Sequence, residues 1–397
     1  MAAEIEPGQV LAGKYEIQST LGEGGMGLVL AAYDTRLERR VAIKLLKPEL
    51  ASNKEACERF VREARAAAKI QSEFVARVID VDLSSDEMPL LVMEYLEGRD
   101  LEHVIAERGP LPVSDVALWI IQACDAIADA HAQRIVHRDL KPANVFLARQ
   151  AGGTESVKVL DFGISKQATT GAANLSLTRT SALMGSPLYM SPEQMRSTRD
   201  VDTRTDIWAL GAILHEALSG NPPFLGETIT QLSANVLLEE PERLDTLRPD
   251  LPAGLGDVVW RALRKDPAQR YTHVGELAFE LLPFAPRSAS AIVDRIQRVL
   301  IGSGLVQEAF VIDAPRAERA SLRVTGHATV PPSPPLGASI AAKARTLANF
   351  VQTGDNEARN PAPLGRAVVA LALLAVVAVL LVWRSPPATA ARPAAGA

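Results

Sequence analysis

The sequence predicts an α+β chain in which a smaller β-rich lobe precedes a larger, mainly helical lobe, followed by one C-terminal transmembrane helix. Three observations predict this. Residues 15–96 read mostly as strands with a single helix, residues from Leu111 onward have helical periodicity, and residues 367–383 form 17 positions without a charge. We divide the chain into a tail (1–14), a β-rich lobe (15–96), a helical lobe (97–283), a largely disordered linker (284–365), an apolar span (366–384) and a Pro/Ala-rich tail (385–397).

Composition excludes some classes of protein. The 42 Lys and Arg residues are balanced by 47 Asp and Glu residues, a formal net charge of −5, which argues against a nucleic-acid partner. The two cysteines, Cys57 and Cys124, are far apart and lack metal-ligand spacing. We therefore expect two reduced cysteines in a cytosolic main segment.

In the β-rich lobe, residues 54–70 predict the single helix. Phe60, Glu63, Ala67 and Ile70 share one helical stripe, and Glu63 is the only charge on it, so we expect it to point inward at a partner. Strand residues Leu90–Met93 and a connector at 94–98 follow.

In the helical lobe, Val113–Asp115 predicts an N-cap before a long apolar helix that runs to about Gln133. Thr205–Asp206 predicts the start of a second helix, apolar on nearly every side and therefore buried, which ends at Gly220. We expect the helical region to end near Pro283. A weakly helical patch at 289–300 could extend the fold or be unstructured.

The segment 367–383, flanked by Arg366 and Arg384, would span about 26 Å as a helix, at the short end for crossing a membrane. The alternative is a buried helix of a soluble domain. Flanking arginines are equal in number on both sides, so the charge rule does not set the orientation. We expect a single-pass protein of the cell membrane with its long N-terminal part in the cytoplasm.

A G-x-G-x-x-G pattern occupies the run Leu21, Gly22, Glu23, Gly24, Gly25, Met26 and Gly27. A dinucleotide-binding fold needs a helix after this pattern, whereas here residues 28–33 read as a strand, so we expect a hairpin. The absence of G-K-[ST] excludes a Walker-type loop. Glycines in a hairpin let backbone N–H groups approach phosphates. Lys44 ends the next apolar run and can neutralise the α- and β-phosphates while Glu63 holds it in place.

The run His137–Val145 places Asp139, Lys141 and Asn144 at fixed offsets, and Asp161-Phe162-Gly163 follows a β-rich run. A carboxylate, an ammonium and an amide in one loop, followed by a second carboxylate, suit phosphoryl transfer from a metal-bound nucleotide.

Taken in order, V-A-I-K at 41–44, H-R-D-L-K-P-A-N at 137–144, D-F-G at 161–163 and S-P-E at 191–193 resemble the protein kinase superfamily. The details are similar to its bacterial, eukaryotic-like Ser/Thr branch, and the resemblance covers residues 15 to about 283. It implies a two-lobed protein kinase fold, Mg-ATP as cofactor with Mn²⁺ as an alternative metal, and Ser/Thr hydroxyls of proteins as substrates.

The resemblance also implies roles. Asp139 would orient the substrate hydroxyl and accept its proton, Lys141 would neutralise the transferred group, and Asn144 and Asp161 would hold the metal. Val29 and Ala42 would sandwich the adenine, Met93 would be the gatekeeper, and the backbone of Glu94 and Leu96 would bond the adenine edge. Structural roles are implied for the pair Glu193–Arg270, for Asp206 and for His137. Ser186 and Ser191 replace the Thr and Ala common at their positions, and neither change puts Ser/Thr specificity in doubt.

Thr178 and Thr180 lie in a Ser/Thr-rich loop between Gly163 and Glu193, and Arg138 is a cation ready for a phosphate. By resemblance we expect autophosphorylation in trans at both threonines; a homodimer is left open. Two other classes remain as alternatives. A pseudokinase scaffold usually lacks one of the catalytic positions, and all are present here. A ligand-sensing receptor would need an outer domain, and only about a dozen residues follow the span.

Overall fold

The computed structural model describes residues 6–23, 27–47, 50, 53–83, 88–150, 152–162, 186–196 and 201–307. All of them belong to one compact unit, Met1–Glu318. The predicted span 367–383, most of the predicted linker, the tail and the loop carrying Thr178 and Thr180 lie outside the described residues. Within the described part of the chain, no helix is both long enough and apolar enough to cross a membrane.

The first lobe is built on a six-stranded antiparallel sheet with the order β1-β2-β3-β4-β6-β5. Its strands are β1 (Val10–Leu11), β2 (Tyr15–Glu23), β3 (Gly27–Asp34), β4 (Arg39–Leu46), β5 (Val78–Leu83) and β6 (Pro89–Glu94). Buried Ile17, Leu30, Ile43 and Val92 form a core on one side of the sheet. Because successive side chains of a strand point to opposite faces, Lys44 on β4 points away from the core that holds Ile43.

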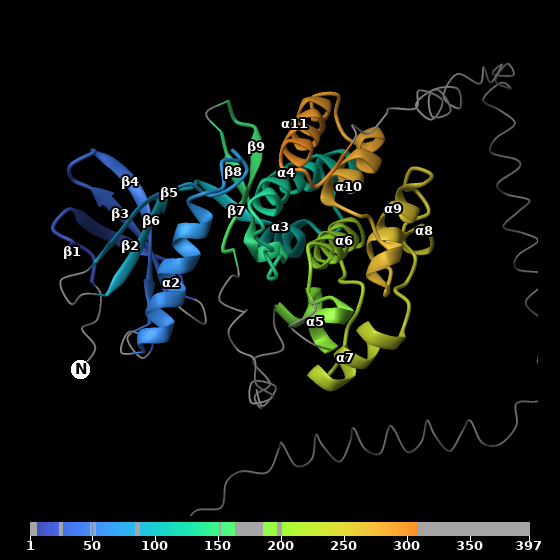
Figure 1. The fold of residues 1–397 in the computed structure, drawn as a ribbon, viewed down its shortest axis with the longest axis horizontal. Coiled ribbons are helices and arrows are strands. Elements are labelled where there is room, and N and C mark those ends of the chain that lie inside the picture. The colour runs from blue at the N-terminus through green and yellow to red at the C-terminus, as the bar shows by residue number, and fades with distance from the viewer. Residues whose placement is uncertain are drawn as a thin grey trace, which may run out of the picture. The chain divides into compact units, whose positions relative to one another are not determined.

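Helix α2 (Lys54–Ala67) is the one described helix of this lobe and lies beside the sheet (Figure 1). The Asn53 side chain caps it by accepting a hydrogen bond of 3.2 Å from the Ala56 amide. Phe60 and Ala64 pack against Leu46 and Leu91 of the sheet. The predicted helix 54–70 is confirmed but ends three residues early, and its last stripe residue, Ile70, enters the core of the second lobe instead.

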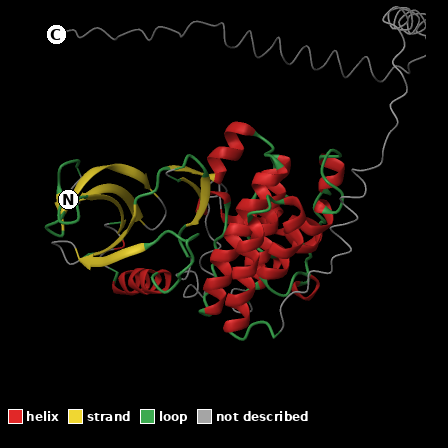
Figure 2. Cartoon of the chain, turned by 90° about the horizontal axis from the view of Figure 1, so that it is seen from above, coloured by secondary structure: helices red, strands yellow, loops and turns green. Residues whose placement is uncertain are grey.

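The second lobe is mainly helical, and Figure 2 shows its helices gathered apart from the strands of the first lobe. Its helices are α3 (Leu101–Arg108), α4 (Val113–Ala132), α5 (Pro192–Arg196), α6 (Arg204–Ser219), α7 (Ile229–Leu238), α8 (Leu244–Leu247), α9 (Leu255–Ala262), α10 (Val274–Leu281) and α11 (Ala289–Gly302), with the short turns η1 (Pro142–Asn144), η4 (Ser186–Tyr189), η5 (Pro267–Gln269) and η6 (Leu282–Phe284). A second sheet has the order β7-β8-β9, from β7 (Gly98–Asp100), β8 (Val145–Arg149) and β9 (Glu155–Val159).

Helices α4 and α6 are buried, as their apolar sequences predicted, and each contributes more residues to the core of this lobe than any other element, with Ile120, Ile127 and Trp208 fully buried. The predicted N-cap at 113–115 is wrong. Helix α4 already begins at Val113 after Pro112, which makes no side-chain cap, so Ser114 and Asp115 lie in its first turn. Because a proline fixes φ near −65°, Pro112 can directly precede the helix. The negative charge of Asp115 in the first turn interacts favourably with the positive end of the helix dipole.

The helical region continues past its expected end near Pro283. Helix α11 packs against α4 and α10, and its residues Val293, Ile296 and Leu300 belong to the main core (Figure 1). The patch at 289–300 therefore extends the fold, and the predicted disordered linker cannot begin at 284. The apolar stripe of α11 is short, which is why its periodicity alone did not decide the question.

Candidate active site

The glycine-rich segment forms a hairpin, as predicted. Strand β2 ends with Gly22 opposite Val29 and Glu23 opposite Leu28 of β3. A side chain at Gly27 would meet the Leu45 carbonyl oxygen at 2.1 Å, so only glycine fits between the strands. The Glu23 carboxylate pairs with Lys47 at 2.8 Å. Gly24, Gly25 and Met26 at the tip lie outside the described residues.

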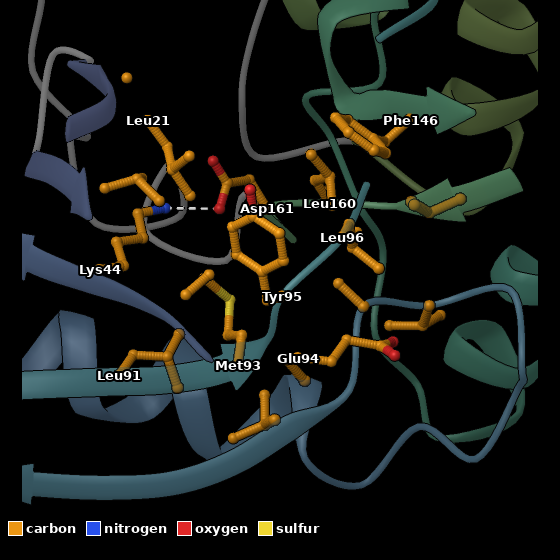
Figure 3. A pocket seen from close by; sticks show the side chains of 18 of the residues that line it. Leu21, Lys44, Leu91, Met93, Glu94, Tyr95, Leu96, Phe146, Leu160 and Asp161 are labelled. Carbon is orange, nitrogen blue, oxygen red and sulfur yellow. Dashed lines mark hydrogen bonds and ion pairs between the residues drawn. The ribbon is translucent and has the colours of Figure 1, made fainter. Parts of the chain in front are cut away.

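A cavity of about 640 Å³ lies beneath this hairpin and is lined by residues of both lobes (Figure 3). Its volume is typical of a small-molecule site. The predicted residues that line it are Leu21, Gly22, Val29, Ala42, Lys44, Glu63, Met93, Glu94, Leu96 and Asp161. Ten of the residues predicted from separate sequence motifs thus share one cavity.

Sequence reasoning missed other lining residues. They include Val75, Ala76, Leu91, Tyr95, Phe146, Val159 and Leu160. These side chains carry no reactive group and match no short motif. The one usable signal was strand alternation, which places Phe146 on the opposite face of β8 from buried Val145 and Leu147.

Lys44 and Asp161 meet inside the cavity. The Lys44 ammonium lies 2.6 Å from Asp161 Oδ1, and the two side chains are 16% and 47% exposed (Figure 3). Glu63 lines the same cavity as this ion pair. The Lys44–Glu63 contact stays a prediction, and the Lys44–Asp161 ion pair is one that the sequence did not predict.

Of the loop at 137–144, Ala143 lines this cavity, whereas Asp139, Lys141 and Asn144 do not; Asp139 lines a separate, smaller pocket with Arg138. Lys141 Nζ lies 4.0 Å from Asp139 Oδ2. The Asn144 side-chain amide donates to the Asp139 carbonyl at 2.7 Å, which fixes the orientation of the amide and leaves its oxygen for another ligand. Asp139, Lys141 and Asn144 are thereby held as one unit.

Asp206, at the start of α6, holds this loop in place through hydrogen bonds. Its carboxylate accepts hydrogen bonds from the amides of His137 and Arg138, both at 2.9 Å, and from His131 Nε2 at 2.8 Å. Burial alone raises the pKa of the Asp206 carboxyl, but the hydrogen bond and charge of His131 and the Arg138 amide outweigh it and hold this pKa below its usual value. Arg138 itself adopts a φ of 65°, a strained backbone that this bracing maintains.

His137 connects the loop to Asp161. Its Nε2–H donates to the Leu160 carbonyl at 3.0 Å, while Nδ1 accepts from the Asp139 amide at 3.3 Å, an arrangement that fits a neutral ring. Burial lowers the pKa of His137. The predicted architectural role of His137 agrees with these contacts.

Asn144 and Asp161 lie close together, because the Leu160 amide donates to the Asn144 carbonyl at 2.9 Å. An amide oxygen and a carboxylate are ligands suited to Mg²⁺. No cluster of three or more His, Cys, Asp or Glu side chains suited to a metal occurs among the described residues. A hard cation held by Asn144 and Asp161 would take its other ligands from phosphates and water.

The implied buried ion pair is present. Arg270 Nη1 and Nη2 donate to the two carboxylate oxygens of Glu193 at 2.7 and 2.8 Å. Gln194 next to it donates to the Arg138 carbonyl at 2.9 Å, so helix α5 is tied to the loop that carries Asp139.

Comparison with known proteins agrees with this geometry. Residues 15–282 match the model of the protein kinase domain. The chain belongs to the protein kinase family. Serine/threonine-protein kinase PknB of Mycobacterium leprae is 35% identical over 301 residues, which cover 74% of this chain and 47% of the relative. PknB of Mycobacterium tuberculosis is 37% identical over 275 residues, covering 68% and 43%.

Among solved structures, the PknI kinase domain of Mycobacterium tuberculosis superimposes with a TM-score of 0.54 at 28% identity, covering 70% of this chain and 98% of that domain. This likeness agrees with the two-lobed kinase fold described above. The chain spans less than half the length of the curated relatives named here.

Proposed function

We propose that the protein is a serine/threonine protein kinase that transfers the γ-phosphoryl group of Mg-ATP to hydroxyl groups of proteins. The observation that carries the proposal is the approach of Lys44 to Asp161 in a cavity of about 640 Å³ beside the loop of Asp139 and Asn144. Cationic and acidic groups from both lobes converge where a triphosphate and its metal would be held.

In this proposal the cavity walls bind the nucleotide. Val29 and Ala42 enclose the adenine, Met93 limits the depth of the pocket, and the backbone of Glu94 and Leu96 bonds the adenine edge. Lys44 orients the α- and β-phosphates. Glu63, which lines the same cavity, holds the Lys44 ammonium in place for this role.

The remaining polar groups act on the transferred group. Asp139 orients the attacking hydroxyl and accepts its proton, and Lys141 neutralises charge on the phosphoryl oxygens. Mg²⁺, held by Asn144 and Asp161, supplies charge neutralisation at the β- and γ-phosphates. Catalysis is then mainly positioning and electrostatic stabilisation.

Incubation of the full chain with γ-labelled ATP, Mg²⁺ and a basic protein substrate tests the proposal. We expect label on Ser and Thr, and Asp139→Asn should lower the rate about 10²- to 10⁴-fold while nucleotide binding is kept. Glu107→Gln, on the exposed face of α3, is the control variant. Nucleotide binding without any transfer by the wild type would support the pseudokinase alternative.

Two further proposals concern segments outside the described residues. Thr178 and Thr180 are autophosphorylated in trans, and the phosphates pair with Arg138, which lines a small pocket together with Asp139. Mass spectrometry after ATP treatment should find both sites, and replacing both by Ala should strongly reduce activity; full activity of that variant would rule out the switch.

The segment 367–383 anchors the chain in the cell membrane, with the kinase domain on the cytoplasmic side. Its uncharged sequence supports this proposal. Alkaline extraction of membranes from expressing cells should leave the full chain in the pellet, and a chain lacking 367–383 should be released. Extraction of both forms would contradict the anchor.

A further inference from the structure

Helix α11 lies beyond the residues that match the kinase family and is nevertheless built into the lobe. The family match ends at residue 282, and α11 covers Ala289–Gly302. Val293, Ile296 and Leu300 form its buried stripe, and the helix packs on α4 and α10, beside which it lies in Figure 1. One charged residue beside this stripe, Arg295, turns toward α4.

The Arg295 guanidinium forms an ion pair with Oδ2 of Asp125 on α4. The Asp125 side chain is fully buried, and the same oxygen accepts a hydrogen bond of 2.6 Å from the Ser72 hydroxyl. Ser72 is 53 residues from Asp125 in sequence, and Arg295 is 170 residues from it. A single buried carboxylate therefore joins α11, α4 and the segment that follows α2.

That segment, residues 71–76, connects the end of α2 to strand β5 and contacts both α4 and strand β9. The Gln71 amide donates to Asp129 of α4 at 2.6 Å. The Phe74 carbonyl accepts from the Val159 amide at 2.7 Å, and the Ala76 amide donates to the Val159 carbonyl at 3.1 Å. Val159 precedes Asp161 by two residues, and helix α2 carries Glu63, so this segment sets the spacing between Glu63 and Asp161.

Electrostatics make Arg295 important to the connection that the Asp125 carboxylate forms between α11, α4 and residues 71–76. Burial raises the pKa of the Asp125 carboxyl, and the hydrogen bonds from Ser72 and Arg295 act against that rise. Within the described part of the chain, the second oxygen, Oδ1, has no hydrogen-bond partner. Without the guanidinium, the carboxyl would take up a proton or draw in water, and its bond to Ser72 would change in either case.

We propose that Arg295 is a positioning residue for phosphoryl transfer, which acts through Asp125 and Ser72 on the spacing between Glu63 and Asp161. The inference deepens the kinase function proposed above and rests on it for its kinetic readout. It makes α11, which the family match does not include, a part of the catalytic apparatus of this chain.

The test compares full-length wild type with Arg295→Met, Arg295→Lys and the control Arg298→Met, which removes an exposed charge from the same helix. We expect Arg295→Met to lower kcat about tenfold with little change in the KM for ATP, and Arg295→Lys to restore most of it. Arg298→Met should match the wild type. A folded Arg295→Met with wild-type kcat would overturn the proposal.

A second readout does not depend on turnover. Hydrogen exchange of α2 and of residues 71–76 should increase in Arg295→Met and not in Arg298→Met. An unchanged exchange pattern would contradict the coupling even if the wild type transferred no phosphate, in which case the proposed function would fail separately.

Ser72→Ala covers the case in which Arg295→Met does not fold. It removes the hydrogen bond from Ser72 to Asp125 and leaves the Arg295–Asp125 ion pair in place. It should reduce kcat in the same way. Where both single variants fold, the double variant should lose less than the two effects combined, because both act through one carboxylate. Wild-type kcat and exchange in Ser72→Ala, or additive losses in the double variant, would overturn the proposal.

Discussion

The ion pair between Glu193 and Arg270 allows a stability prediction whose size follows from the structure. Arg270 has a side chain with 0% exposure and Glu193 one with 13%, and the two make a bidentate contact. Removing one partner of a buried pair costs about 3–5 kcal/mol because it leaves an uncompensated charge. Arg270 also donates to the carbonyls of Arg204, Arg264 and Lys265, which partly stabilise the guanidinium when the carboxylate is lost.

For Glu193→Gln we therefore expect a loss near the lower limit, about 3 kcal/mol in the free energy of unfolding. The amide keeps the shape of the side chain and can still accept one hydrogen bond from Arg270. In a thermal melt this corresponds to a decrease in Tm on the order of 5 °C for a unit of this size. Urea unfolding followed by tryptophan fluorescence gives the free energy directly, since Trp208 lies beside Arg270.

The matched control is Glu107→Gln, which breaks the ion pair between Glu107 and Arg99. The two side chains are 56% and 53% exposed, respectively. Such surface pairs contribute less than about 1 kcal/mol, so this variant should unfold almost like the wild type. Equal losses in the two variants, or a loss below about 1 kcal/mol in Glu193→Gln, would refute the reasoning from burial.

Three further outcomes are expected. Lys44→Met should lower phosphoryl transfer about 10²- to 10³-fold in the labelled-ATP assay without lowering Tm, and near-normal turnover would remove Lys44 from the phosphate site. Stability should decrease as the pH falls below about 6.5, because burial lowers the pKa of His137 and the unfolded chain takes up the proton first. Urea midpoints of His137→Gln should depend less on pH in that range; an unchanged dependence would contradict this assignment. The larger side chain of Ala42→Phe should occupy part of the cavity and weaken ATP binding about tenfold or more in a fluorescence titration. Unchanged affinity would place the adenine elsewhere.

Local chemistry explains why much of the site could be predicted from the sequence. The strand after Gly27 predicted a hairpin, and the offsets within residues 137–144 fixed which polar groups share one loop. The stripe on residues 54–70 placed Glu63 on the face of α2 that lines the cavity. Each of these features depends on residues close together in the chain, where backbone geometry leaves few alternatives.

Where sequence reasoning failed, the outcome depended on contacts between distant segments. Asp161, which pairs with Lys44, is 117 residues away from it, and no spacing along the chain encodes that contact. Likewise, the sequence left open whether residues 289–300 extend the fold, and the contact of Arg295 with Asp125, at a separation of 170 residues, became apparent only in the structure.

The sequence alone therefore determined which chemical groups this protein has and which of them are neighbours along a strand, helix or loop, because 2.0 and 3.6 residue periodicities and glycine geometry are local properties. Only the tertiary structure decided which carboxylate meets the Lys44 ammonium and that Arg295 reaches Asp125. Those pairings are set by packing between elements, where a shift of a few ångströms exchanges one partner for another.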